Sequence, residues 1–571
     1  MAETFYTTRD LDFHPNAALH PSPSDWRDQV IYFLLVDRFD NNAPDLPAFD
    51  PAATPRGRPE GQGHVFQGGN LRGVTRRLDY IHDLGCTTLW LSPILRNRTD
   101  QSTSYHGYGI QDFLEVDPRF GTLEDLRELT AAAHARGMYV ILDIILNHTG
   151  DVWAYPADDP YYYYQGQRFP FGFWREADPA PGLQKVDGVW PSEIQFEDAF
   201  KRQGQIQHWE ADPEYRDGDF FSLKELDINH PQVLDALVKV YKYWIVNADL
   251  DGFRVDTVKH METSATAIFC NAIREYAQRV GKHNFFLFGE IVADDGFIQR
   301  YLGRNSRIEG TNERFPSLDA ALDFPLYFIL EEVIKGFASP AFLRQRYQAF
   351  RDQYTDHGEA GRYFVTFVDN HDQMARPYRR FMHHNPHPQQ AVLAAAYLLT
   401  SQGVPCIYYG SEQGFDGGGP DDSYVRETMF GGQWGAFDTT GAHCFNPGHP
   451  IYQGIRAVAA VRRESPALRY GRQYFRETSG DGLSFAQPME QPCLLAWSRI
   501  LDTEEVLVTL NLDGQPRTEA VTVDRHLSAP GSRLRNLLAP DQAVTVQTAA
   551  DGRAYAWIDL PGHGLGLWRS D

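Results

Sequence analysis

The chain has 571 residues, of which 42% are hydrophobic and 23% are charged, and its formal net charge is −23. This length predicts two to four domains, one of which can be a large barrel. The negative field repels phosphates, so nucleic acids and anionic membranes are excluded as expected partners, whereas a neutral substrate is compatible with it. The oligomeric state stays open.

The N-terminus and the cysteines bear on localisation. No apolar run is long enough to span a bilayer, and the segment from Met1 to His20 contains acids but no hydrophobic stretch typical of a signal peptide. We therefore expect a cytoplasmic protein, or a secreted one whose leader has been removed. The five cysteines show no CxxC spacing, and we expect them to be mostly free and buried.

Short apolar runs, each ending in polar or charged residues, alternate with helical patterns along the chain. The runs are residues 30–37, 87–94, 138–148, 250–256, 285–292, 322–327, 363–372 and 404–412. One helical pattern opens with Thr122 as its expected N-cap and closes on Gly137. Continuous apolar runs fit strands of a parallel sheet that is covered on both faces. Eight of them alternating with helices predict an α/β fold, a (β/α)8 TIM barrel, with a doubly wound sheet as the structural alternative.

Two segments break this alternation. Residues 149–222 follow the third strand, are too long for an ordinary loop and are rich in aromatic residues, among them Trp153, Tyr155 and Tyr161 to Tyr164. We interpret them as a small inserted domain, so that residues 1–148 and 223–467 form the barrel. Four antiparallel strands are expected in residues 468–571, which predicts a C-terminal β-sandwich. These strands are 505–512, 518–524, 554–560 and 564–570.

Carboxylates follow three of the expected barrel strands, at the end where barrel enzymes carry their active sites. Asp256 ends the fourth strand, Glu290 the fifth and Asp372 the seventh. Cleavage of a glycosidic bond with retention needs two carboxyl groups about 5–5.5 Å apart, and neighbouring strand ends can supply them. Arg254 shares a strand face with Asp256, where a cation favours the ionised carboxylate. Glu290 follows an apolar run, and a partly desolvated site would raise its pKa, as a general acid requires.

Other residues near these strand ends have side chains suited to sugars. His148 and His371 are neutral hydrogen-bond donors for hydroxyl groups. Tyr108, in a loop after the second strand, could form a platform for an apolar sugar face. We expect Asp143 to support Arg254.

Six segments carry a resemblance to a known family. Residues 143–148 (DIILNH), 252–260 (GFRVDTVKH), 288–291 (FGEI) and 367–372 (FVDNHD) resemble, in order, the four conserved regions of the α-amylase family. Residues 106–113 (HGYGIQDF) and 403–414 (GVPCIYYGSEQG) are similar to two further family segments. Each motif alone is weak, but four in order, each at an expected strand end, form a strong signal.

The resemblance implies a role for each matching residue. Asp256 would be the nucleophile, Glu290 the general acid/base, and Asp372 the carboxylate that holds the 2- and 3-hydroxyls of the distorted sugar. In the same subsite, the sugar would be contacted by Arg254, His148, His371 and, through stacking, Tyr108. Lys259 and His260 would lie on the leaving-group side, and this pair resembles enzymes that act on α-1,4-glucans. Gly109 stands where pocket-forming α-glucosidase-like relatives have Asp, which favours an open cleft.

The resemblance also implies a structural Ca²⁺ between the barrel and the inserted domain, and no organic cofactor. Asn147 and the backbone carbonyl of His260 would be ligands, since Ca²⁺ prefers oxygen donors. The further ligand is often an Asp in the family, but here the segment reads LKEL, with Glu225 in that place and Lys224 beside it.

Three functions are compatible with these residues. The first is a hydrolase that cleaves α-1,4-glucosidic bonds of starch-type poly- or oligosaccharides. The second is a transglycosylase, including cyclodextrin-forming and isomerising enzymes, that passes the same glycosyl-enzyme to a sugar. The third is an inactive binding or assembly subunit, against which the intact carboxylates argue.

Overall fold

The computed structural model describes residues 4–158, 162–176, 184–305, 315–350, 354–355, 358–372 and 378–571. At its centre lies an eight-stranded parallel sheet in the order β12-β11-β10-β5-β2-β1-β16-β15. The strands are β1 (Ile31–Leu34), β2 (Thr88–Leu91), β5 (Tyr139–Ile144), β10 (Gly252–Val255), β11 (Phe286–Gly289), β12 (Ala320–Ala321), β15 (Val365–Thr366) and β16 (Val404–Tyr408). A parallel bridge between Leu322 and Val365 joins the two edges. The predicted (β/α)8 barrel is confirmed, and the doubly wound alternative is wrong.

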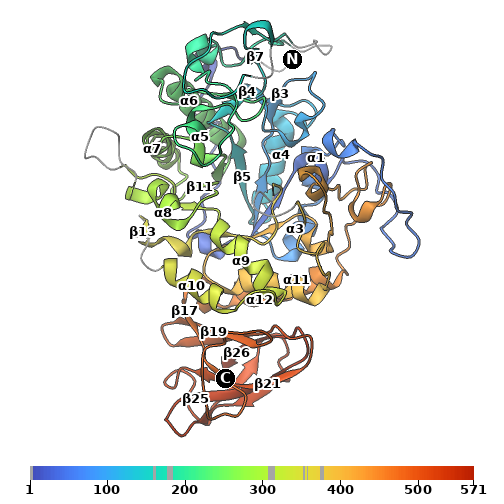
Figure 1. Ribbon diagram of the computed structural model, residues 1–571, viewed down its shortest axis with the longest axis vertical. Helices are drawn as coiled ribbons and strands as arrows, with labels where there is room; N and C mark the ends of the chain where they lie inside the picture. Colours follow the sequence, from blue (N-terminus) through green and yellow to red (C-terminus); the bar gives the residue numbers. More distant parts are fainter. Residues whose placement is uncertain are drawn as a thin grey trace.

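Helices surround the barrel (Figure 1). The main ones are α2 (Leu71–Arg76), α3 (Leu78–Leu84), α4 (Leu123–His134), α6 (Pro231–Ala248), α7 (Thr263–Arg279), α9 (Phe324–Ile334), α10 (Ala341–Phe350), α11 (Pro388–Thr400) and α12 (Pro450–Glu464). Thr122 caps α4 as expected, in a capping box with Asp125. None of the described helices has the length and hydropathy of a membrane-spanning segment.

The sixth strand differs from the prediction. Residues 322–327 were expected to form it, but the strand is the two-residue β12 just before them, and α9 begins at Phe324. The side chain of Asp323 accepts a hydrogen bond from the backbone N–H of Leu326, and Pro325 lies in the first helical turn. An Asp N-cap followed by Pro starts a helix, so local capping chemistry outweighs the apolar pattern here.

The segment 149–222 contains short elements packed around buried aromatic rings. At its two ends β6 (His148–Thr149) pairs with β9 (Lys224–Glu225), and within it β7 (Trp153–Ala154) pairs with β8 (Phe173–Trp174). Trp153 and Tyr155 are buried, so part of the aromatic content forms this segment's own core. Tyr161 lies outside the described residues.

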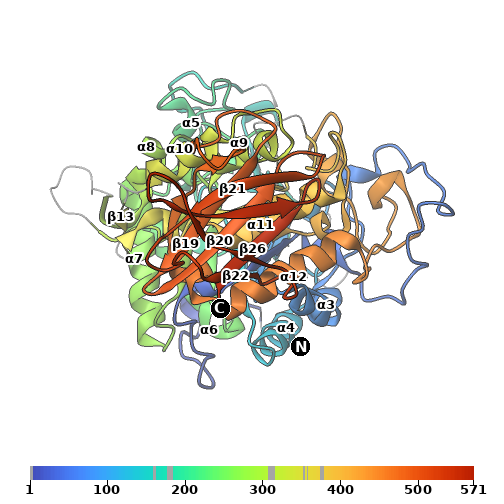
Figure 2. The same cartoon turned by 90° about the horizontal axis from the view of Figure 1, so that it is seen from below.

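The C-terminal residues form two antiparallel sheets, of six strands (β17-β19-β20-β26-β22-β23) and four strands (β18-β21-β25-β24). Their longer strands are β19 (Leu494–Leu501), β20 (Glu504–Asn511), β21 (Arg517–Val523), β25 (Ala554–Leu560) and β26 (Leu565–Ser570). The sheets lie at the end of the molecule opposite the segment 149–222 and cover the barrel helices when seen from below (Figures 1 and 2). All five cysteines are buried and free, as expected.

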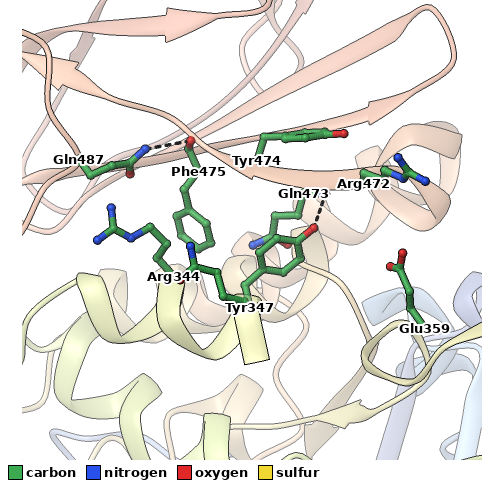
Figure 3. A pocket seen from close by; sticks show the side chains of 9 residues that line it. Arg344, Tyr347, Glu359, Arg472, Gln473, Tyr474, Phe475 and Gln487 are labelled. Atoms are coloured by element: carbon green, nitrogen blue, oxygen red, sulfur yellow. Dashed lines mark hydrogen bonds between the residues drawn. The ribbon is translucent and has the colours of Figure 1, made fainter. Parts of the chain in front are cut away.

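A cavity of about 580 Å³ lies between α10 and β17 (Arg472–Phe475), where the barrel meets these sheets. Arg344 and Tyr347 reach it from α10, and Tyr474 lies along its other side (Figure 3). The backbone N–H of Gln473 donates to the hydroxyl of Tyr347 at 3.3 Å, which ties the two parts together. The catalytic carboxylates expected from the sequence do not line this cavity.

Candidate active site at the carboxyl ends of the barrel strands

Asp256 and Glu290 are neighbours because of the register of their strands. β10 and β11 pair in parallel with Val255 opposite Gly289, and each carboxylate is the next residue along its strand. Neighbouring strands lie about 4.8 Å apart. Arg254 contacts both groups, with Nη1 2.7 Å from Oδ1 of Asp256 and Nη2 3.0 Å from Oε2 of Glu290. One buried guanidinium therefore brings the two expected catalytic carboxylates together.

Burial dominates the electrostatics of this group. It raises the pKa of Glu290 to about 8, against the lowering effect of Arg254, and the charges of Asp256 and Asp372 add to the rise. Burial also raises the pKa of Asp143 to about 7, although Nη1 of Arg254 lies 2.7 Å from its Oδ1. This 2.7 Å contact between Asp143 and Arg254 is the one that the sequence predicts. A pKa raised in this direction favours the protonated form of Glu290, which is the form that a general acid needs.

Tyr108 and the two histidines line the same site. The hydroxyl of Tyr108 donates to Oδ2 of Asp143 and lies 2.9 Å from Nε2 of His371. Nε2 of His148 is 4.0 Å from Oδ2 of Asp256. Burial lowers the pKa of both histidines, so both are neutral. His148 Nε2 and Glu290 Oε1 are buried and have no hydrogen-bond partner among the described residues, which leaves them available to a hydroxylated ligand.

Asp372 lies beside these residues and is paired with an arginine that the sequence analysis missed. Its Oδ2 is 3.1 Å from Nε2 of His371, and its Oδ1 accepts from Nη2 of Arg426 at 2.6 Å. Arg426 also donates to the carbonyl of His371 and to the hydroxyl of Tyr105. It is buried and lies 54 residues beyond Asp372 in the chain, outside any strand, so no periodic signal marks it.

Lys259 and His260 lie on the loop after β10, beside an aromatic cluster. Lys259 Nζ contacts Oε1 of Glu210 at 2.6 Å. The ring of His260 lies 4.5 Å from that of Phe220 and 6.0 Å from that of Trp209, between centroids. Phe221 packs on Trp209 and is 65% exposed. We call these rings the Trp209 cluster (Trp209, Phe220 and Phe221); they belong to the segment 149–222, whose aromatic residues the sequence does not divide into core and surface.

Two of the residues expected to bind Ca²⁺ lie side by side. The side-chain amide of Asn147 donates to Oε2 of Glu225 at 2.6 Å. Asn147 Oδ1 and Glu225 Oε1 are buried without a hydrogen-bond partner in the described structure, which suits a hard cation. However, the ammonium of Lys201 already lies 3.8 Å from that oxygen of Glu225. The positive charge of Lys201 opposes a divalent ion at Glu225, so these residues do not fit the expected Ca²⁺ site.

A second group of potential ligands lies elsewhere. His64, Asp421 and Asp422 offer ligand atoms within 4.8 Å of one another among the described residues. Asp422 is already paired with Arg426 at 2.8 Å, and His64 is exposed. A clustered pair of acids without further evidence does not make a metal site.

A closed (β/α)8 barrel with paired, buried carboxylates at its strand ends is the architecture of a barrel enzyme with acid–base chemistry. The sequence profile described as "Alpha amylase, catalytic domain" matches residues 33–431. The chain therefore belongs to the α-amylase family.

The similar proteins include hydrolases and transferases. An α-amylase from Streptomyces lividans is 32% identical over 539 residues, which cover 86% of this chain and 55% of that protein. A cyclomaltodextrin glucanotransferase from Geobacillus stearothermophilus is 28% identical over 559 residues, covering 94% of this chain and 67% of that protein. This chain thus spans about half the length of the Streptomyces relative, and 36% of a β/α-amylase from Paenibacillus polymyxa.

Two solved structures extend the comparison. The α-amylase of Geobacillus thermoleovorans, complexed with acarbose, superposes with a TM-score of 0.70 at 26% identity, covering 96% of this chain and 99% of that one. A cyclomaltodextrin glucanotransferase with a three-domain ABC distribution superposes with a TM-score of 0.70 at 25% identity, covering 95% and 99%.

Proposed function

We propose that this protein is a retaining enzyme that cleaves α-1,4-glucosidic bonds of starch-type poly- or oligosaccharides through a covalent glycosyl-enzyme. The observation that carries the proposal is the guanidinium of Arg254, which contacts Asp256 and Glu290 at 2.7 and 3.0 Å. It supports two carboxyl groups side by side, as retention requires. The acarbose complex of the Geobacillus thermoleovorans α-amylase supports an α-glucan as substrate.

In the first step, a carboxylate oxygen of Asp256 attacks the anomeric carbon. The bond from that carbon to the glycosidic oxygen breaks, and Glu290 gives its proton to the departing oxygen, which becomes the 4-hydroxyl of the released chain. The raised pKa of Glu290, about 8, supports the role of proton donor. The guanidinium of Arg254 lies 2.7 Å from Oδ1 of Asp256 and orients this carboxyl group for attack.

In the second step, the ester between Asp256 and the sugar is hydrolysed. Glu290, now a carboxylate, takes a proton from a water molecule as that water attacks the anomeric carbon. Asp256 leaves as a carboxylate, and the product keeps the α configuration, since two inversions have occurred. Asp372, held by Arg426, would accept hydrogen bonds from hydroxyls of the distorted sugar, together with the neutral His148 and His371. Tyr108 would pack against the same sugar.

We propose further that Lys259 and His260 contact the leaving-group side, where the Trp209 cluster offers ring faces to a second sugar. An acceptor sugar held there would compete with water for the glycosyl-enzyme. This feature, together with the similarity to cyclomaltodextrin glucanotransferases, favours transglycosylation as the second candidate function.

A product time course on maltoheptaose distinguishes the two. Hydrolysis adds one reducing end for each bond broken, and its products are shorter than the substrate. Cyclic products, or products longer than the substrate, formed without a matching rise in reducing ends would favour transfer and contradict a pure hydrolase. No turnover of starch, maltooligosaccharides, pullulan or sucrose would contradict both.

A further inference from the structure

A buried lysine lies where the segment 149–222 meets the barrel. The side chain of Lys201 is 6% exposed. Its Nζ is 2.5 Å from the carbonyl oxygen of Arg216, 3.3 Å from Oδ1 of Asp217, 3.4 Å from Oε1 of Glu262 and 3.8 Å from Oε1 of Glu225. These oxygens come from α5 (Glu214–Asp217), from β9 and from the start of α7. One amine thus joins three separate parts of the chain.

The surroundings keep this amine charged. The carboxyl groups of Asp217, Glu262 and Glu225 lie 3.3, 3.4 and 3.8 Å from its Nζ, and their negative charge favours the ammonium form. Arg216 Nη1 adds a second cation 3.2 Å from Oε1 of Glu262. Buried carboxylates need such partners, because an isolated ionised group is costly away from water.

The contacts of the amine reach the leaving-group side of the site. Lys201 binds the carbonyl of Arg216, and His260 contacts the carbonyl of Tyr215, the residue before it. Glu262 follows His260 by two residues. The amine therefore helps to fix α5 against the loop that carries Lys259 and His260.

We propose that the ammonium of Lys201 is the resident cation of this junction and replaces the structural Ca²⁺ that family resemblance implies. Ca²⁺ needs six to eight oxygen ligands at about 2.3–2.6 Å. One carboxylate oxygen of Glu225 is bound to the amide of Asn147. A calcium ion bound to the other oxygen, Oε1 of Glu225, would lie no more than about 6 Å from the buried ammonium of Lys201, which would repel it. The protein joins its inserted segment to the barrel with its own positive charge.

The first test uses the unmodified protein. After purification without added calcium, elemental analysis is expected to find no stoichiometric Ca²⁺, and the Tm is expected to stay within about 1 °C on addition of EGTA. One bound Ca²⁺ per chain, or a fall of several degrees in EGTA, would overturn the proposal.

The second test uses Lys201→Ser, which removes the amine and leaves the surrounding oxygens. Its Tm is expected to fall by several degrees and to rise again in millimolar CaCl₂, because a divalent ion can then enter. The matched control is Lys282→Met. This lysine is also buried and paired with two carboxylates, Asp249 and Asp251, but away from the junction.

The control variant is expected to lose stability without any response to calcium. A Lys201→Ser variant that melts like the unmodified protein, or that does not respond to calcium, would show that the amine does not stand in the place of an ion. If this variant fails to fold, the EGTA and elemental measurements on the unmodified protein decide the question.

Discussion

Nη1 of Arg254 lies 2.7 Å from Oδ1 of Asp256, and the same nitrogen lies 2.7 Å from Oδ1 of Asp143. The guanidinium also reaches Glu290, so three carboxyl groups share one buried cation. One positive charge cannot neutralise three negative charges, and burial raises the pKa of Asp143 to about 7 and that of Glu290 to about 8. Three carboxyl groups around one cation, together with burial, therefore favour a proton on this group of acids.

Replacement of Asp256 by Asn is expected to lower kcat on maltoheptaose by several orders of magnitude, about 10⁴-fold or more, because the amide cannot form the glycosyl ester. The Kd for maltoheptaose, measured by calorimetry, is expected to change little, because Arg254 keeps Asp143 and Glu290 as partners. Activity near that of the unmodified protein would refute the role of Asp256.

The pH profile of kcat/KM is expected to fall on its alkaline side with an apparent pKa near 8. In the proposed mechanism Glu290 must be protonated to assist the leaving group, and burial raises its pKa to about 8. Because these carboxyl groups interact, the apparent value belongs to the cluster around Arg254. An alkaline limb that begins below about pH 6 would contradict the assignment of Glu290 as the acid.

Glu290→Gln is expected to inactivate the enzyme and yet raise its Tm at pH 9. The pKa of Glu290 is higher in the folded protein, about 8, than in an unfolded chain, about 4.3. Ionisation therefore destabilises the folded state progressively from about pH 4.3 and fully above about pH 8. The Tm difference between variant and unmodified protein should be small at pH 4 and several degrees at pH 9. A difference that does not depend on pH would contradict this linkage.

Arg426→Lys is expected to lower kcat/KM about 10- to 100-fold. Arg426 fixes Asp372, the carbonyl of His371 and the hydroxyl of Tyr105 with separate nitrogens, and lysine cannot reproduce that geometry. Arg380→Lys is the matched control, because Arg380 is also buried and pairs with a carboxylate, that of Glu427. Equal losses in both variants would indicate a general packing effect.

Phe221→Ala is expected to reduce transfer to an added maltooligosaccharide several-fold relative to hydrolysis, with little change in Tm, because the ring is 65% exposed. The ratio of longer products to new reducing ends measures this change. Phe337→Ala serves as control, since Phe337 is 53% exposed and lies just beyond α9. An unchanged ratio would indicate that the Trp209 cluster does not bind the acceptor sugar.

The amino-acid pattern predicts the barrel and the strands that carry Asp256 and Glu290, because a buried parallel strand leaves a continuous apolar run that ends where the chain meets solvent. It misplaces the sixth strand, because the apolar run 322–327 belongs mostly to α9, which Asp323 caps, and the strand β12 lies just before that run.

The sequence alone therefore determines which residues follow the carboxyl ends of the strands. They lie in the motifs DIILNH, GFRVDTVKH, FGEI and FVDNHD. Only the tertiary structure determines which other side chains those residues contact. Arg426 reaches Asp372 across 54 residues, and Lys201 meets Glu225 and Glu262 from another segment. Such contacts depend on how loops of unequal length fold over the barrel. The electrostatic balance of the site depends on them, because charges interact through space and not along the chain.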